Sequence, residues 1–358
     1  MRIAFLAAGS LSNPKESSRI TLLLLAKELQ KQGHQVILIA RKRPSLPPEE
    51  SVEGVRILRS SLLTFPRTVR QLEKEGHWDI IHGFSAAPLF ALISFGCSQV
   101  TEKAQCIHSL KSSPRELWKK GGEVFLNLMS KVTVPTQVQA SGLKWVQKKK
   151  VSVLPSVIDT QKFRPRNQGK LKKKYGYENK KIIFYYGALW KNKGFDLLLE
   201  SLPRLHETNF LLLCAPRYHQ ISEQQQRARQ LGISNQVLFL TQDVAIEEYV
   251  AMADVVVLPY RSLAGTEGNP SCLLEAMASK TPVVTTDLPE LREIAEGCIL
   301  MAQPGDVASL VDQISQALQK YPTELMETAY QKSQEFSVER VSKQVLELYQ
   351  PYPLHLAD

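Results

Sequence analysis

The feature that most constrains this chain is a repeated order of short apolar runs and amphipathic segments. Residues 3–7 form an apolar run, and residues 20–32 carry apolar side chains at helical spacing before Gly33 ends the segment. Residues 35–40 then form a second apolar run. A strand, a helix and a second strand in this order predict a βαβ unit, whose buried strands pair in parallel. The chain is therefore predicted to be an α/β protein.

The same alternation continues along the chain and restarts once. In the first half, further strands are predicted at residues 80–82, 105–107, 131–134 and 151–154. Residues 163–179, which are rich in basic residues, proline and glycine, interrupt the series. A second series then has predicted strands at 181–186, 209–214, 236–240, 255–259 and 282–286, and a helix at 195–205.

A chain of 358 residues exceeds what one hydrophobic core usually supports, so two domains are expected. We place a Rossmann-like, doubly wound domain at residues 1–163 and a second at residues 164–336. Residues 337–358 form an amphipathic helix and a tail, for which packing back on the N-terminal domain is one option. Two doubly wound domains carry their ligand sites at the carboxyl ends of their strands.

Charge is divided unevenly between the two halves of the chain. Residues 1–165 carry 25 Lys and Arg against 12 Asp and Glu, whereas residues 166–358 carry 20 against 23. A basic first half suits an anionic lipid, an anionic acceptor or nucleic acid. No aromatic ladder or nucleic-acid motif accompanies the charge, so we expect no nucleic-acid partner. Trp145 among the lysines 144 and 148–150 leaves open a peripheral membrane contact or an ordinary solvated surface.

Five cysteines are scattered along the chain and form no CxxC pair. This pattern fits neither a disulfide framework nor a zinc site, and it favours a reducing compartment. No stretch has the features of a signal peptide or reaches the ~20 apolar residues that span a bilayer. We expect a cytoplasmic protein, on the inner face of a membrane at most.

The most specific stretch runs from residue 258 to residue 278. A strand ends at Pro259, a glycine-containing loop follows, and a helix is predicted to begin near Asn269 or Pro270. The N–H groups of a first helical turn, beside the positive end of the helix dipole, form a seat for a diphosphate. Glu267 precedes this helix and Glu275 lies within it. Because carboxylates accept hydrogen bonds from neighbouring hydroxyls, Glu267 suits a sugar ring and Glu275 a ribose.

This Glu-x7-Glu stretch resembles the donor-site signature of the retaining GT-B glycosyltransferases of family 4, also called group 1. The resemblance continues in order over nearly the whole chain. The further matching segments are Gly33-His34-Gln35-Val36, residues 78–82, residues 155–165, Gly187-Ala188-Leu189 with Lys193-Gly194, and residues 282–293. The resemblance implies GT-B architecture, with two facing Rossmann-like domains and a cleft between them. It implies an acceptor-binding first domain, a nucleotide-sugar-binding second domain, and a hexosyltransferase of cell-envelope polysaccharide synthesis acting on a glycan or lipid-linked acceptor.

The resemblance also implies roles for single residues. The catalytic candidates are His108 and Glu267, which would face the donor sugar from the two domains. Lys193 would neutralise the diphosphate, and Glu275 would hold the ribose. The remaining donor-side positions are Gly187, Lys191, Gly268, Asn269, Pro270, Ser271 and Glu293. The family's front-face transfer, in which the departing diphosphate takes the acceptor's proton, needs no metal ion and no cofactor.

Three departures from the family pattern bear on the donor site. The family often has two adjacent glycines in the first loop of the acceptor-binding domain. This chain lacks that pair there, and the nearest equivalents are Gly9-Ser10 and Ser17-Ser18. Ala188 stands where the family has an arginine that contacts phosphate, and Lys191 is a nearby cation that could replace it. The turn after the strand at 209–214 reads Cys214-Ala215-Pro216-Arg217 in place of a glycine-rich one.

Two rival functions share this fold. A binding module or scaffold would hold a nucleotide sugar, or a partner glycosyltransferase, without turning over. An epimerase would act on the nucleotide sugar itself and would form product with no acceptor present. The joint presence of Lys193, His108 and the two glutamates favours the transferase over both.

Overall fold

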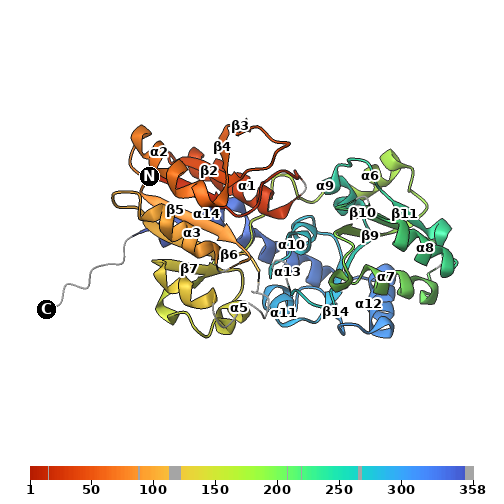
Figure 1. The fold of residues 1–358 in the computed structure, drawn as a ribbon. Helices are drawn as coiled ribbons and strands as arrows, with labels where there is room; N and C mark the ends of the chain where they lie inside the picture. Colours follow the sequence, from red (N-terminus) through yellow and green to blue (C-terminus); the bar gives the residue numbers. More distant parts are fainter. Residues whose placement is uncertain are drawn as a thin grey trace. The chain divides into compact units, whose positions relative to one another are not determined.

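A computed structural model describes residues 1–14, 16–87, 89–112, 122–207, 209–218, 220–264 and 268–350. These residues divide into two compact units. The first unit contains Met1–Val157 and the C-terminal helix, and the second contains Ile158–Ala264 and Asn269–Ser337. Each unit is built around one β-sheet with helices packed on it (Figure 1). The prediction of two α/β domains is therefore confirmed.

The first unit has an eight-stranded sheet in the order β3-β4-β2-β1-β5-β6-β7-β8. Its strands are β1 (Arg2–Ala7), β2 (Gln35–Arg41), β3 (Glu49–Val52), β4 (Val55–Ser60), β5 (Ile80–Ser85), β6 (Gln105–Leu110), β7 (Lys131–Val134) and β8 (Val151–Val153). All neighbouring strands pair in parallel except β3 and β4, which form an antiparallel hairpin at the edge. The sequence analysis did not predict this hairpin, because β3 has only one apolar residue and no buried position.

Both faces of this sheet are buried, since successive side chains of a strand point to opposite faces. In β1, Ile3 and Phe5 pack into one apolar cluster, and Ala4 and Leu6 pack into another. The first cluster is completed by helix α1 (Ser17–Lys31), and the second by α2 (Phe65–Leu72) and α3 (Phe90–Ser98). The shorter helical elements are η1 (Leu62–Thr64), η2 (Glu73–Glu75), η3 (Glu123–Leu128), α5 (Gln137–Gly142) and η4 (Lys148–Lys150).

The C-terminal helix α14 (Val338–Tyr349) packs within the first unit, on the same cluster as α1 (Figure 1). Its last residue, Tyr349, has its hydroxyl 2.8 Å from Nδ1 of His82 on β5. Nε2 of His82 is 2.7 Å from the hydroxyl of Ser109, which is 2.6 Å from the hydroxyl of Thr133. All four side chains are buried. The first unit is therefore assembled from both ends of the chain.

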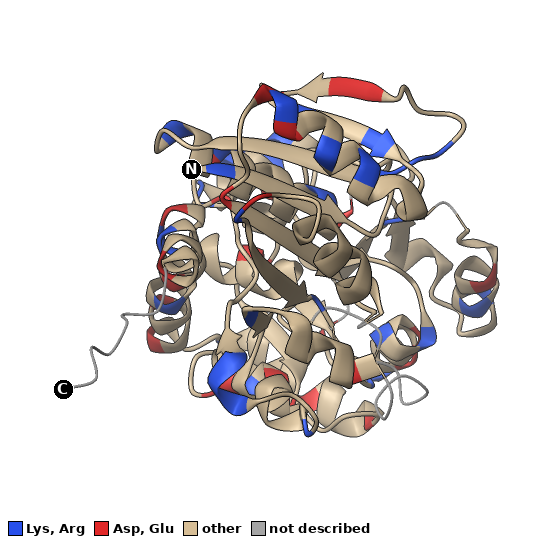
Figure 2. Ribbon diagram, turned by 60° about the vertical axis from the view of Figure 1, so that its left-hand side comes forward, with Lys and Arg blue, Asp and Glu red and all other residues tan. Residues whose placement is uncertain are grey.

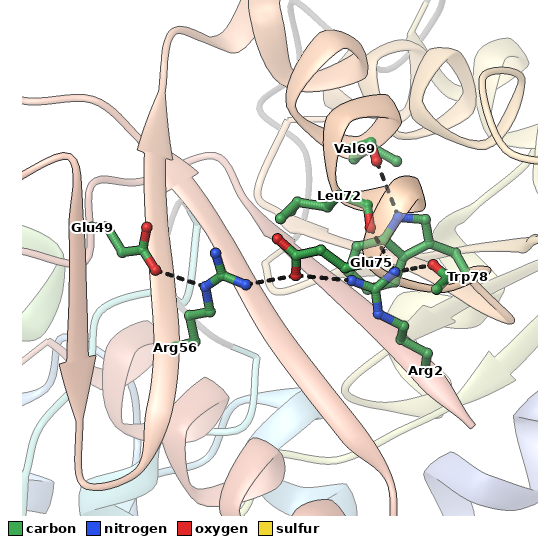
Figure 3. Close-up of polar contacts among 8 residues, drawn as sticks. Arg2, Glu49, Arg56, Val69, Leu72, Glu75 and Trp78 are labelled. Atoms are coloured by element: carbon green, nitrogen blue, oxygen red, sulfur yellow. Dashed lines mark hydrogen bonds and ion pairs between the residues drawn. The ribbon is translucent and has the colours of Figure 1, made fainter.

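Arg2 anchors the amino end of the first sheet (Figure 3). Its guanidinium lies 4.0 Å from the ring centroid of the buried Trp78 and donates to the carbonyl oxygen of Leu72 at 2.8 Å. It also lies 3.4 Å from the carboxylate of Glu75, which accepts a second hydrogen bond from Arg56 at 2.8 Å. A buried cation requires such partners, because an unpaired charge away from water is costly.

The second unit has a six-stranded sheet in the order β11-β10-β9-β12-β13-β14, and all its strands are parallel. The strands are β9 (Lys181–Gly187), β10 (Phe210–Pro216), β11 (Val237–Phe239), β12 (Val255–Leu258), β13 (Val283–Thr286) and β14 (Leu300–Ala302). The helices are α6 (Gln168–Tyr175), α7 (Phe195–Ser201), α8 (Ser222–Gln230), α9 (Ile246–Met252), α10 (Ser271–Ala278), α11 (Pro289–Ala295), α12 (Val307–Gln319) and α13 (Thr323–Ser333). The 3₁₀ turns are η5 (Lys191–Lys193), η6 (Leu202–Arg204), η7 (Ser234–Gln236) and η8 (Gln334–Phe336).

The chain passes from the first unit to the second at Val157, earlier than the boundary placed at residue 163. Ile158 and Phe163 explain the difference, because both pack into an apolar cluster of the second unit. Ile158 also donates its backbone N–H to the carbonyl oxygen of Phe336 at 2.9 Å. The helix predicted at 195–205 is α only to Ser201, and a 3₁₀ turn containing Pro203 follows it. Proline supplies no N–H for a longer α-helix.

The charged residues lie mainly on the helices and loops that surround the two sheets (Figure 2). Within the residue ranges given above, no helix is both long enough and apolar enough to cross a membrane.

Candidate functional site

The loops that follow β9 and β12 are joined at the carboxyl edge of the second sheet. β9 and β12 are neighbouring parallel strands, so their loops leave the sheet on the same side. The backbone N–H of Arg261 donates to the carbonyl oxygen of Asn192 at 2.9 Å, and the Asn192 side chain donates to Ala264 at 3.2 Å. The Arg261 guanidinium is paired with the Asp196 carboxylate at 2.6 Å. These contacts fix the loop that carries Lys191 and Lys193.

Gly194 allows the two loops to approach this closely. Its φ is +72°, in the left-handed region that side chains disfavour. A Cβ atom built on Gly194 would lie 1.8 Å from the carbonyl oxygen of Pro259, at the end of β12. Backbone occupies the space where a side chain would be, so only glycine fits beside Lys193.

Lys193 is positioned over an aromatic ring at this edge. Its ammonium nitrogen lies 4.6 Å from the ring centroid of the buried Tyr260, close enough for a cation–π interaction. The Tyr260 hydroxyl is 2.9 Å from Sγ of Cys272, the second residue of α10. Burial raises the pKa of the Cys272 thiol, and the positive charge of Lys193 opposes that rise. The positive charge of Lys193 is therefore close enough to influence the first turn of α10.

Helix α10 begins at Ser271, and Pro270 occupies the N-cap position. The carbonyl oxygen of Pro270 accepts from the N–H of Leu273 at 3.1 Å. The Pro270 side chain itself forms no cap hydrogen bond, and the first turn of α10 has no acidic residue. Gly268 and Asn269, which precede Pro270, are buried. The start of α10 near Lys193 combines the positive end of the helix dipole with a cation, which suits an anionic group.

The Glu275 carboxylate is oriented by a tyrosine that the sequence analysis did not single out. The Tyr186 hydroxyl, from β9, lies 2.9 Å from Oε2 of Glu275 and 2.9 Å from the carbonyl oxygen of Cys272. Burial raises the pKa of Tyr186 well above its ordinary value, so the hydroxyl keeps its proton and donates it. Glu275 is half-buried and lies three residues after Cys272 on α10, which places the two residues on the same face of the helix.

The other predicted donor-side residues occupy different places. Gly187 is the last residue of β9 and has a φ of +135°, and Lys191 is exposed in η5. Glu293 is exposed on α11, which follows the neighbouring strand β13. Glu267 lies outside the described residues.

The predicted residues of the first unit lie in the connection between β1 and α1. Gly9 is exposed, and its carbonyl oxygen accepts from the N–H of Arg41 at 3.1 Å. The Ser10 hydroxyl is 3.1 Å from that of Ser12. Ser17 and Ser18 open α1, with Ser17 buried and Ser18 half-buried. This loop leaves the carboxyl end of β1, which is the edge where ligand sites of such sheets lie.

His108 is enclosed within the first unit. Its side chain on β6 has no exposed surface, and its Nε2 and Nδ1 lie 3.1 Å and 3.3 Å from the hydroxyls of Ser85 and Ser94. Burial lowers the pKa of His108 to about 3, so the imidazole is neutral at pH 7. Direct contact between this ring and a ligand would require the surrounding side chains to move.

Sequence reasoning missed Tyr186 and Tyr260 because a tyrosine in or after an apolar strand resembles an ordinary core residue. Their position at the carboxyl ends of β9 and β12 is the signal that could have found them. Among the side chains described, no three His, Cys, Asp or Glu are grouped so that they could hold a metal ion.

Comparison with known proteins shows the family to which the chain belongs. Residues 19–162 match the family described as "Glycosyltransferase Family 4", and residues 180–320 match "Glycosyl transferases group 1". The chain belongs to the group 1, family 4 glycosyltransferases, as the two matches in succession cover most of both units.

Individual relatives are distant in sequence. The chain is 26% identical over 215 residues to the lipopolysaccharide core biosynthesis mannosyltransferase of Rhizobium meliloti (strain 1021), covering 54% of this chain and 58% of that protein. Sucrose-phosphate synthase from Thermosynechococcus elongatus superposes with a TM-score of 0.83 at 19% identity, over 98% of both chains. HepE of Anabaena, solved in complex with UDP and glucose, gives 0.81 at 17% identity, over 97% of this chain and 98% of that one. The fold is GT-B.

Proposed function

We propose that this protein is a retaining glycosyltransferase whose second unit binds a nucleotide-sugar donor. The observation that carries the proposal is the grouping at the start of α10. Lys193 lies over Tyr260, Tyr260 contacts Cys272 in the first turn of α10, and the N-cap residue Pro270 forms no side-chain cap. Glu275 lies one helical turn further on and is held by Tyr186. The complex of HepE with UDP and glucose supports a nucleotide sugar as the ligand class.

Each part of this grouping has a task in glycosyl transfer. Lys193 and the α10 start would stabilise the negative charge that develops on the departing diphosphate. Glu275 would accept hydrogen bonds from two neighbouring ribose hydroxyls. Glu267 would contact the donor sugar. In front-face transfer, the bond from the anomeric carbon to the diphosphate oxygen breaks, the acceptor oxygen bonds to the same face, and its proton passes to the diphosphate.

We propose further that this transfer needs no metal ion, because a lysine and a helix dipole supply the positive charge. Activity should then be unchanged when the enzyme is dialysed against EDTA and assayed without added Mg²⁺ or Mn²⁺. Loss of activity on dialysis, with recovery on adding back one of these ions, would contradict this part of the proposal.

The donor site is tested by thermal stabilisation. A ligand that binds only the native state stabilises it by RT ln(1 + [L]/Kd), about 2.7 kcal/mol at one hundred times Kd. Wild type, Glu275→Ala and the control Glu324→Ala, an exposed glutamate on α13, are each mixed with UDP-, GDP-, ADP- and TDP-sugars. We expect one nucleotide sugar to stabilise wild type and the control, and Glu275→Ala much less. If none shifts the wild-type protein, the proposal is wrong.

The acceptor is proposed to be a glycan or a lipid-linked molecule held by the first unit. One observation favours the rival of a non-catalytic binding module: Ala188 stands where the family has an arginine. The two are separated by following the nucleotide sugar that stabilises the protein. A transferase consumes it faster when an acceptor extract is added, an epimerase converts it without acceptor, and a binding module leaves it intact.

A lipid-linked acceptor would bring the first unit to an anionic membrane surface. Trp145 has 57% of its surface exposed, and Val124 and Leu128 of η3 are also exposed. Asn127 of the same turn donates to the carbonyl oxygen of Trp145 at 2.8 Å, so these apolar side chains belong to one region. Lys144 and the lysines of η4 adjoin Trp145 in the chain. Basic residues around exposed apolar side chains suit an interfacial contact.

Sedimentation with vesicles tests this contact. Binding to vesicles of phosphatidylglycerol and phosphatidylcholine should fall with added salt and with Trp145→Ala. Equal binding to phosphatidylcholine vesicles alone would contradict the electrostatic part of the proposal.

A further inference from the structure

The strands β9 and β10 bring Ala188 and Arg217 side by side at the carboxyl edge of the second sheet. The two strands are parallel neighbours, and their last residues, Gly187 and Pro216, are partners in the register. The next residues along the two strands are therefore also adjacent. The backbone N–H of Arg217 donates to the carbonyl oxygen of Gly187 at 2.8 Å, which continues the ladder by one bond.

An aromatic pair joins the loops that follow these two positions. Trp190 and Tyr218 stack with ring centroids 6.1 Å apart and an interplanar angle of 23°. Arg217 stands between the end of its strand and this stacked tyrosine. The backbone of Arg217 is therefore held on both sides. Its side chain leaves the backbone at the carboxyl edge of the second sheet, where Lys193 also lies.

Arg217 is half-buried. Its guanidinium has no hydrogen bond or ion pair with any side chain or backbone group in the described part of the chain. Arg59 and Arg261, which are buried to a similar or greater degree, each have a carboxylate partner, Glu50 and Asp196. The Arg217 guanidinium is therefore available to an anionic ligand, and a diphosphate is a group with which arginine forms paired hydrogen bonds.

Arg217 acts electrostatically on the same place as Lys193. Burial raises the pKa of the Cys272 thiol, and the positive charges of Lys193 and Arg217 both oppose that rise. Burial also raises the pKa of Tyr260, and the positive charge of Arg217 opposes that rise. Cys272 is in the first turn of α10, and Tyr260 lies beneath Lys193. Two cations from different loops thus lie near one helix start.

We propose that Arg217 binds the diphosphate of the donor, and that it supplies from β10 the guanidinium that Ala188 does not supply from β9. Arginine presents paired N–H donors that match two phosphate oxygens, whereas lysine presents a point charge. Lys191, the substitute suggested by the sequence, is exposed, whereas Arg217 is half-buried. The inference rests on the proposed function, because it takes a nucleotide diphosphate as the ligand.

The test compares ligands with and without phosphate on matched variants. UDP, GDP, ADP and TDP, and the corresponding nucleosides without phosphate, are titrated by calorimetry into wild type, Arg217→Ala, Arg217→Lys and Arg229→Ala. Arg229 is an exposed arginine on α8, so its replacement changes the net charge equally. We expect Arg217→Ala to weaken binding of the preferred diphosphate by about 10- to 100-fold, the usual effect of losing a charged hydrogen-bonding group. Arg217→Lys should fall between, and Arg229→Ala should stay within about twofold of wild type.

The phosphate-free nucleosides and the melting temperature without ligand separate binding from folding. Nucleoside affinity should be equal in wild type and Arg217→Ala, and the unliganded variant should melt no lower than wild type, because its cation has no partner to lose. Wild-type affinity for the diphosphate in Arg217→Ala would overturn the inference and leave the proposed function standing. A lower melting temperature with proportionate loss of nucleoside binding would also overturn it, in favour of a structural role. If none of the four diphosphates binds wild type, both proposals fall.

Discussion

Replacing Gly194 by alanine should destabilise the second unit by more than its backbone conformation alone explains. A non-glycine residue in the left-handed region costs roughly 1–2 kcal/mol. In addition, the new Cβ would meet the carbonyl oxygen of Pro259 at 1.8 Å, and a backbone atom has little freedom to withdraw. Relieving such a contact distorts bond angles or separates the loops, which adds about 2 kcal/mol or more. We expect a total loss of about 3 kcal/mol or more in the free energy of unfolding.

Gly232 provides the matched control for this experiment. It lies in the same unit and has the same φ of +72°, but a Cβ built on it would meet nothing within 4 Å. Gly232→Ala therefore carries the backbone cost and the change in unfolded-state entropy without the contact. The difference between the two variants isolates the close approach of the loop to Pro259.

Differential scanning calorimetry on the full chain would give the two melting temperatures, and each measurement would be repeated with saturating UDP or GDP. Gly194→Ala should melt several degrees below Gly232→Ala, because about 1 kcal/mol shifts the midpoint of a domain of this size by roughly 2–4 °C. It should also lose most of the stabilisation by diphosphate, since its loop carries Lys193. Equal melting temperatures for the two variants would refute the reasoning.

Three further predictions concern the buried polar groups. Tyr349→Phe removes the hydroxyl 2.8 Å from His82 and leaves a fully buried imidazole nitrogen without its partner, so urea unfolding should show a loss of about 1–3 kcal/mol; no loss would contradict this hydrogen bond. Burial holds the pKa of His108 at about 3, below the ordinary 6.5, so the unfolded chain binds more protons than the folded one between these pH values. The free energy of unfolding, measured at pH 7 and pH 5, should therefore decrease by roughly 1 kcal/mol for each unit by which the pH drops below 6.5. An equal free energy at both pH values would count against the enclosed ring. Tyr186→Phe should weaken binding of the stabilising nucleotide about 3- to 10-fold, less than Glu275→Ala does, and an unchanged affinity would show that the carboxylate needs no such support.

The sequence was sufficient to predict the elements that are apolar and regularly spaced. The two parallel sheets follow from buried runs such as those of β1 and β9, whose residues are almost all enclosed. The hairpin of β3 and β4 was missed because an edge strand needs few apolar residues. The start of α10 was placed to within one or two residues by its proline.

The candidate site was predictable in part. The positions of Lys193 and Glu275 follow from local motifs, whereas the contacts that orient them come from residues distant in the sequence. Tyr186 reaches Glu275 from a neighbouring strand, and Arg217 stands beside Ala188 because of sheet register. His108 was predicted to face a ligand, but the direction of a strand side chain depends on register and on what packs against it. No local pattern carries that information.

The return of the chain to the first unit at α14 has a consequence for synthesis on the ribosome. The first unit buries Val341, Val345 and Tyr349 of α14 in the same cluster as Ile3 and Phe5 of β1. These partners are separated by almost the entire chain, so the first half emerges without the helix that closes its core. The second unit is built from residues 158–264 and 269–337, all of which precede α14 in the chain. The first unit can therefore close its core only after every residue of the second unit has been synthesised.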